Sequence, residues 1–264
     1  MTKMHTRTSL AAFLLFVAGA PSCSVKEDRT PCPCYLQVSF TDPEASGPVI
    51  LLGRGETTSF REQARVEDCR PYWTRPVDKG ILDFFACKGI RQASVDGSRV
   101  TIPEGGQADS LYAFSTQVDA TGEFAPVPVT LHKQFATVFL DIRKTAGELP
   151  DYRFSVTGNT CGTNLQDHSP IPGPFYFSPS AREGDAIVFF RLPRQADDSL
   201  SLSVRYGDAA PSAFPLGELI RDTGYSWKTE DLQDIYVSID LTRGKILVVV
   251  GDWENGMNLP FVDA

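Results

Sequence analysis

Apolar and polar residues alternate along several stretches of this sequence, and that period-two pattern limits the fold more than any other feature. The windows 36–40, 152–156, 200–206 and 235–241 each place an apolar side chain at every second position. Successive side chains of a β-strand point to opposite faces, so each window predicts a strand with one face on a core and one in water. A parallel sheet covered by helices would instead show continuous apolar strands separated by helical periods. The sequence therefore predicts an all-β protein built from antiparallel β-sandwiches.

Three further windows, 138–143, 186–192 and 246–250, are apolar on both faces and predict strands that are covered on both sides. One short helix is predicted over 216–221, between Pro215 and Gly224.

A domain boundary is indicated near residue 128. Gly122, Pro126 and Pro128 interrupt the strand pattern there, ahead of an apolar-rich stretch. We expect two tandem antiparallel β-sandwich domains, 35–128 and 129–264, each of ordinary size for this class. The sequence contains no evident internal repeat.

The N-terminus has the layout of a secretory signal. Lys3 and Arg7 precede an uncharged apolar run over 10–20. This run is too short to cross a hydrocarbon layer of ~30 Å. Small residues then lead to Cys23, an arrangement that resembles a bacterial lipoprotein signal except at Pro21. We expect a signal peptide over 1–22 and a tether over 23–34 held to outer-membrane lipid through Cys23; an ordinary secretory signal is the alternative.

Charge and cysteine content restrict the partners further. Loss of Lys3 and Arg7 with the signal would change the net charge from −8 to −10, which disfavours nucleic acid as a partner. Export permits disulfides. Beyond Cys23 an odd number of cysteines remains, so at least one stays unpaired within the chain. Cys161 stands apart, and a bridge is expected to run from the Cys32 and Cys34 pair to one of two later cysteines, Cys69 or Cys87.

Enzymatic and metal motifs are not found. Only His132 and His168 follow the signal, so a three-histidine zinc site is impossible. Gly53-Arg54-Gly55 lacks the last glycine and the helix of a dinucleotide loop. Adjacent acids at 67–68, 197–198 and 230–231 are typical of solvated surface rather than of glycosidase carboxylates. We expect no enzyme activity, no cofactor and no metal.

Two separate parts of the sequence carry recognisable motifs. The first is the segment 26–36, Lys-Glu-Asp-Arg-Thr-Pro-Cys-Pro-Cys-Tyr-Leu, and the second comprises His132-Lys133 and the segment 149–162. The first resembles the start of the mature anchor subunits of Bacteroides-type, fimbrillin-related fimbriae, and the second resembles their second domain. The resemblance spans most of the chain after the signal. It implies two transthyretin-like sandwiches and a non-enzymatic outer-membrane lipoprotein. Such a protein anchors or terminates a fimbrium on the cell surface, with fimbrial shaft subunits as partners.

In that family a strand of one subunit completes a sheet of the next, which is β-augmentation. Two segments could take part here. One is the apolar stretch with Ile246, Val248 and Val250, and the other is the tail with Leu259 and Phe261. Both also have a plain structural interpretation, as the last core strand and a frayed end.

Aromatic clusters suggest an alternative function. Tyr72-Trp73, Phe175-Tyr176-Phe177 and Tyr225-Ser226-Trp227 could form platforms for sugars or partner surfaces, although such residues more often fill cores. The alternative is a surface lipoprotein adhesin or a glycan-binding fimbrial tip subunit, whose host ligand the sequence leaves unknown.

Overall fold

The computed structural model of this 264-residue chain describes residues 32–143, 151–182, 187–240 and 245–250. Strands dominate that part of the chain, in which helix is confined to η1 (Val66–Cys69) and α1 (Leu216–Asp222). The all-β sandwich prediction is therefore confirmed, and so is the short helix after Pro215. Gly224, with φ of +81°, follows that helix in the left-handed conformation common just beyond helix ends.

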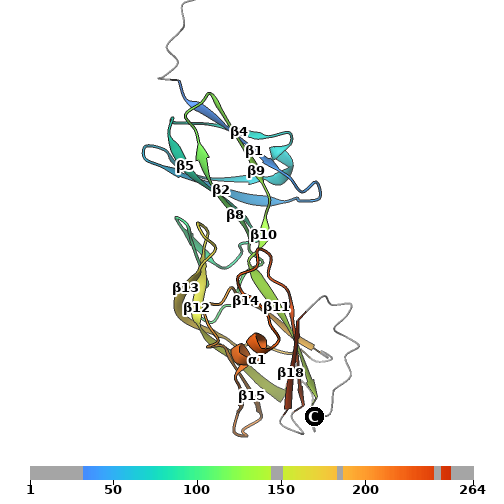
Figure 1. The fold of residues 1–264 in the computed structure, drawn as a ribbon. Helices are drawn as coiled ribbons and strands as arrows, with labels where there is room; N and C mark the ends of the chain where they lie inside the picture. The colour runs from blue at the N-terminus through green and yellow to red at the C-terminus, as the bar shows by residue number, and fades with distance from the viewer. Residues whose placement is uncertain (1–31, 144–150, 183–186, 241–244, 251–264) are drawn as a thin grey trace, which may run out of the picture. The chain divides into compact units, whose positions relative to one another are not determined.

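The N-terminal half contains a three-stranded and a five-stranded sheet (Figure 1). In the three-stranded sheet, β1 (Cys34–Phe40) lies between β4 (Trp73–Val77) and β9 (Phe124–Val129). The five-stranded sheet has, in spatial order, β10 (His132–Lys133), β8 (Tyr112–Asp119), β5 (Ile81–Lys88), β2 (Pro48–Gly55) and β3 (Ser59–Arg65). Alternate residues of both sheets, among them Leu36, Leu51 and Phe84, form one buried core. Burying one such side chain stabilises the fold by about 1.5–3 kcal/mol.

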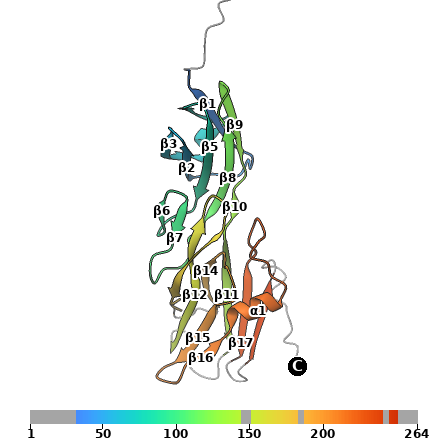
Figure 2. The same ribbon diagram turned by 60° about the vertical axis from the view of Figure 1, so that its left-hand side comes forward.

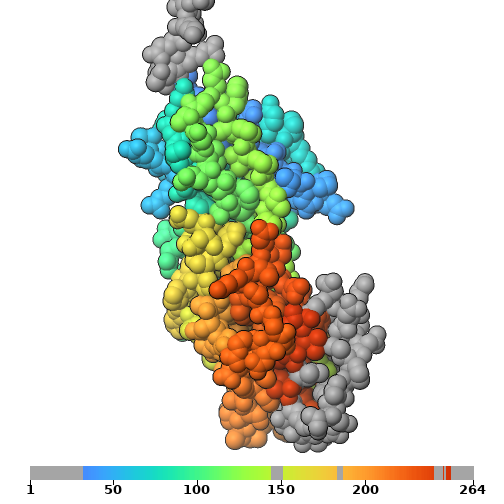
Figure 3. All heavy atoms as spheres, viewed as in Figure 1, coloured from blue at the N-terminus to red at the C-terminus, as the bar shows by residue number. Residues whose placement is uncertain are grey.

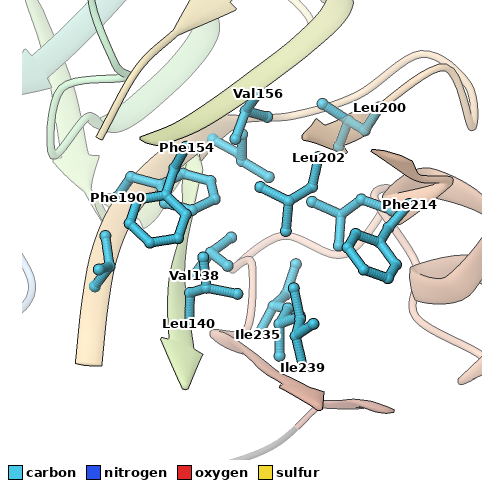
Figure 4. Close-up of a cluster of buried hydrophobic side chains, with 14 of the residues drawn as sticks. Val138, Leu140, Phe154, Val156, Phe190, Leu200, Leu202, Phe214, Ile235 and Ile239 are labelled. Carbon is cyan, nitrogen blue, oxygen red and sulfur yellow. The ribbon is translucent and has the colours of Figure 1, made fainter. Parts of the chain in front are cut away.

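The C-terminal half also pairs two sheets, here of four and six strands. The four-stranded sheet has the order β14 (Ile187–Pro193), β11 (Phe135–Arg143), β17 (Ile235–Asp240) and β18 (Lys245–Val250). The six-stranded sheet comprises β16 (Ser212–Phe214), β15 (Ser201–Tyr206), β12 (Tyr152–Asn164), β7 (Arg99–Thr101) and β6 (Ser94–Asp96), with β13 (Pro170–Phe177) paired to β12. Side chains such as Leu140, Phe154, Phe190 and Leu202 interdigitate between these sheets (Figure 4).

The two halves repeat one pairing pattern. The strand β1 pairs antiparallel with β4 and parallel with β9, and β11 pairs antiparallel with β14 and parallel with β17. Most strand pairs of the described residues are antiparallel, as expected, and these two parallel pairs are the exceptions. The alternation of apolar and polar residues indicates which face of a strand is buried but not the direction of the neighbouring strand. The parallel pairs therefore cannot be predicted from the local sequence.

The hairpin of β6 and β7 lies early in the chain yet joins the six-stranded sheet through β12. Gly162 of β12 permits this contact, because a Cβ there would lie 2.1 Å from the carbonyl oxygen of Val100. Residues on both sides of position 128 thus share one sheet, and the division into domains at that residue stays a prediction.

The interruption predicted over Gly122–Pro128 was wrong, because Phe124–Val129 forms β9. Proline is tolerated in a strand where its missing N–H would have faced away from the neighbouring strand. The strand lies at the edge of its sheet, beside β1 in both ribbon views (Figures 1 and 2). This position explains how two prolines fit.

Candidate functional site

The sheet edges are the candidate functional site, because an exposed edge offers unpaired N–H and C=O groups to a strand of another chain. Natural proteins block most edges with prolines, charges, short strands or covering loops. The edges of β3, β4, β6, β9, β14, β16 and β18 differ in what prevents another strand from pairing there.

Prolines block the β9 edge. The Tyr35 N–H donates to the Glu123 carbonyl at 2.8 Å, and the Thr41 N–H donates to the Val129 carbonyl at 3.0 Å. The backbone N–H and C=O groups of odd-numbered β9 residues therefore point to β1. The even-numbered residues, including Pro126 and Pro128, face the outer edge. This edge therefore lacks two donors that an added strand would need.

The opposite edge of the same sheet is blocked in a similar way. The backbone N–H and C=O groups of odd-numbered β1 residues point to β9, so those of Leu36 point to β4. The backbone groups of Arg75, which is paired with Leu36, point back to β1. Thr74 and Pro76, one residue to either side of Arg75, therefore face outward. The outer edge of β4 also lacks a donor at its proline.

A loop covers the β14 edge. The Ala108 N–H donates to the Arg191 carbonyl at 3.1 Å, and the Arg191 N–H donates to Gln107 Oε1 at 2.9 Å. The Arg191 side chain adds a bond from Nε to the Ala108 carbonyl at 2.9 Å. These bonds occupy the strand edge at Arg191.

Charge and short length protect further edges. The strand β3 carries Arg61, Glu62 and Arg65, and Glu62 is ion-paired with Arg75 of β4. The edge strands β6 and β16 span 3 residues each, which leaves little length for pairing.

The edge of β18 differs from these. Its sequence, Lys-Ile-Leu-Val-Val-Val, has no proline and no charge after Lys245. It pairs with β17 along its whole length, from Lys245 opposite Asp240 to Val250 opposite Ile235. Within the described ranges no strand pairs with its other side.

The residues expected to exchange strands lie on the core side of β18. Ile246, Val248 and Val250 stand opposite Ile239, Val237 and Ile235, which are all buried. Val248 is itself buried, and Ile246 packs against the same core. Leu259 and Phe261, the other expected pair, lie outside the described residues, as does Cys23.

The five cysteines of the described part carry free thiols in this structure. Cys32 is exposed, whereas Cys34, Cys69 and Cys87 are buried. Burial raises the pKa of Cys69 to about 11 and the pKa of Cys87 to about 12. Because only the thiolate reacts readily, the thiols of Cys69 and Cys87 are protected from exchange in the folded chain, and the disulfide stays a prediction.

The aromatic clusters expected to form platforms are partly packed and partly exposed, and Tyr72 is among the exposed rings. Trp73 is half-buried against Phe60, with ring centroids 6.2 Å apart, and Trp227 is half-buried against Tyr225 at 4.7 Å. Phe175 belongs to the core, and its neighbour Tyr176 is exposed.

The polar clusters are occupied by local contacts. His132 Nδ1 lies 3.0 Å from Asp231 Oδ2, and Asp231 also accepts the Lys133 N–H at 2.6 Å. Asp197 accepts from Asn159 at 2.6 Å. In the described part of the chain, no three His, Cys, Asp or Glu residues are arranged to hold a metal ion.

Among the same residues, no helix has both the length and the apolar character needed to cross a membrane.

Comparisons with solved structures identify the fold. The fimbrial anchor protein Mfa2 of Porphyromonas gingivalis matches with a TM-score of 0.58 and 10% identity, over 84% of this chain and 98% of the other. The chain has the fold of this protein. A proposed adhesin from Bacteroides ovatus has a TM-score of 0.58 and 15% identity, over 84% and 94%. A proposed polysaccharide-binding protein from Bacteroides thetaiotaomicron has a TM-score of 0.57 and 13% identity, over 84% and 99%. No protein-family model and no curated protein matches the sequence.

Proposed function

We propose that this chain is a non-enzymatic outer-membrane lipoprotein that anchors or terminates a fimbrium, held by lipid at Cys23 and joined to a shaft subunit through β-strand complementation. The Mfa2-like fold supports this role. The chain sequence supports it as well, through the signal-like N-terminus and the cysteine that follows it.

The observation that carries the proposal is the difference between β18 and the edges of β3, β4, β9 and β14. The edges of β4 and β9 carry outward prolines, the β14 edge is covered at Arg191, and β3 is charged. The strand β18 has none of these features in its own sequence. An apolar strand without blocking residues is what β-augmentation requires, since backbone bonds supply affinity and alternate side chains fill pockets.

The contact works in either of two ways. A strand of the shaft subunit adds to the outer edge of β18, or β18 itself is donated and its core-facing valines fill a groove of the partner. Edge addition uses the outward N–H and C=O groups of β18, whereas donation uses the row of Ile246, Val248 and Val250. The tail with Leu259 and Phe261 is the second candidate segment.

Paired proline variants test the β18 edge. Adjacent N–H groups of a strand point to opposite edges. Of Val248→Pro and Val249→Pro, one variant therefore removes a donor from the outer edge, and the other removes a donor that bonds to β17. We expect the less destabilised of the two, judged by thermal unfolding, to lose capture of purified shaft subunit. Thr74→Pro on the already blocked β4 edge is the matched control and should capture normally.

Unchanged capture by both β18 variants would exclude this strand. Truncation after Trp253 then separates the two candidate segments, because it removes the tail and keeps β18. Loss of capture by the truncated chain alone would assign the exchange to the tail.

A further inference from the structure

A second surface lies on the outer side of the three-stranded sheet, and we call it the neutral face. It consists of the eight outward-pointing residues of three strands: Tyr35, Gln37 and Ser39 of β1, Thr74 and Pro76 of β4, and Phe124, Pro126 and Pro128 of β9. None of the eight is charged, in a chain of which 22% is charged. Every one is exposed or half-buried.

The strand register brings the apolar members together. Pro76, Tyr35 and Phe124 stand side by side across the three strands, and Thr74, Gln37 and Pro126 form the next row. The rings of Tyr35 and Phe124 have centroids 6.0 Å apart and are tilted by 33°. Tyr35 is 42% exposed and Phe124 is 58% exposed. Two neighbouring rings thus present their surfaces to solvent beside an amide and a hydroxyl.

A groove continues this surface over the edge of β9. It has a volume of about 390 Å³ and lies between β8 and β9, whose green segments form part of the surface seen in Figure 3. Phe124, Pro126 and Pro128 line one wall, and Thr116 and Gln117 of β8 line the other.

Asp119 also lines the groove, and local bonds hold its carboxylate. Its Oδ1 accepts the Thr121 N–H at 3.0 Å and the Thr121 hydroxyl at 2.7 Å. These bonds keep the pKa of Asp119 below its ordinary value, so the group is anionic at neutral pH. An anionic ligand is therefore disfavoured in this groove.

The chemistry of the surface restricts its ligand. An added strand is disfavoured because Pro76, Pro126 and Pro128 remove donors from both edges of the sheet. The lack of cationic side chains on the face disfavours phosphate-rich or acidic partners. The surface offers flat apolar side chains together with uncharged hydroxyl and amide groups. This combination is typical of sites that bind a small ligand with both apolar and polar parts.

We propose that the neutral face and its groove bind a neutral saccharide chain. A sugar ring has a C–H face that packs on an aromatic or proline ring, and hydroxyls that pair with uncharged polar groups. The C–H faces of successive sugars lie on Tyr35, Phe124 and the β9 prolines. Their hydroxyls bond to Gln37 and Thr74 on the face and to Thr116 in the groove. This site is separate from strand exchange at β18, so either property can be present without the other.

Binding of neutral oligosaccharides tests the proposal. The full chain carries Cys23→Ala, so that no lipid is attached and lipid-driven association does not contribute to the signal. It is titrated calorimetrically with maltohexaose, cellohexaose, laminarihexaose, xylohexaose and mannohexaose. We expect at least one to bind, and Tyr35→Ala/Phe124→Ala to weaken that binding at least tenfold. Tyr176→Ala, which removes an exposed ring from β13, is the control and should bind like the parent. Both rings of the double variant are exposed, so its unfolding temperature should stay near that of the parent.

Three results would overturn the proposal. The first is that none of these neutral oligosaccharides binds. The second is equal binding by the parent and the double variant. The third is that the double variant loses binding to phosphatidylethanolamine–phosphatidylglycerol vesicles but not to sugars, which would make the face a membrane contact.

Discussion

At the scale of single residues, the structure separates neighbours in one strand by burial. Phe190 is fully buried between the sheets of the C-terminal half, and its neighbour Phe189 is 62% exposed. A buried Phe→Ala change removes both transfer free energy and packing, at a cost of about 3–5 kcal/mol. We expect Phe190→Ala to lower the free energy of unfolding by that amount, measured by urea denaturation. Phe189→Ala, the matched control, should change it by less than about 1 kcal/mol.

A cost for Phe190→Ala as small as that for Phe189→Ala would contradict the packing of β14 against the core.

His168 gives the folded chain a dependence on pH. Burial lowers its pKa below 6.5, and the charges of Arg194 and His132 act in the same direction, while Asp167 and Glu230 oppose them. The unfolded chain therefore binds a proton at a higher pH than the folded chain. The stability contributed by neutral His168 is present above about pH 6.5 and is lost as the pH falls below that value.

Replacement of His168 should remove this dependence. The residue has φ of +57°, a conformation that asparagine tolerates, so His168→Asn preserves the backbone. We expect the parent to lose more unfolding free energy than the variant between pH 7.5 and 5.5. Equal losses in the two proteins would exclude His168 as the titrating group.

At the scale of elements, β9 shows what the sequence predicts and what it does not. The alternating windows predicted β15 and β17 well, because alternation directly reports a strand with one buried face. The pattern failed at β9, where the prolines read as a break. Whether proline is tolerated depends on which edge its nitrogen faces, and that is set by the neighbour β1, some ninety residues earlier.

The candidate site shows the same division. The sequence predicts the apolar strand β18, because composition alone distinguishes that run, but it does not predict which of its residues face the core. The neutral face was missed. Its members come from three strands that are far apart in the chain, and only the pairing of Tyr35 with Pro76 and Phe124 brings them together.

The edge-blocking role of the β9 prolines can be measured. Pro126→Thr/Pro128→Thr restores two outward N–H groups to an exposed edge. We expect the double variant to self-associate with increasing concentration in sedimentation velocity, under conditions in which the parent does not. Pro43→Thr, at an exposed turn, is the control.

Concentration-independent sedimentation of the double variant would show that something other than the prolines keeps this edge free.

At the scale of the whole molecule, the described edges divide into blocked and unblocked ones. Prolines, charge or short length protect β9, β4, β3, β6 and β16, and a loop covers β14 at Arg191, whereas the sequence of β18 has no proline and no charge after Lys245. An apolar strand edge without these features is available for the strand pairing that we propose.

The most direct measurement of this account is replacement of Cys23 by alanine in the native host, with fimbriae examined by electron microscopy on cells and in the culture medium. If the chain is the lipid-held base, the Cys23→Ala strain should release fimbriae into the medium and retain few on the cells, while a Cys161→Ala strain resembles the parent. Fimbriae that stay attached and unchanged in length, with only the variant protein released, would contradict the anchoring role.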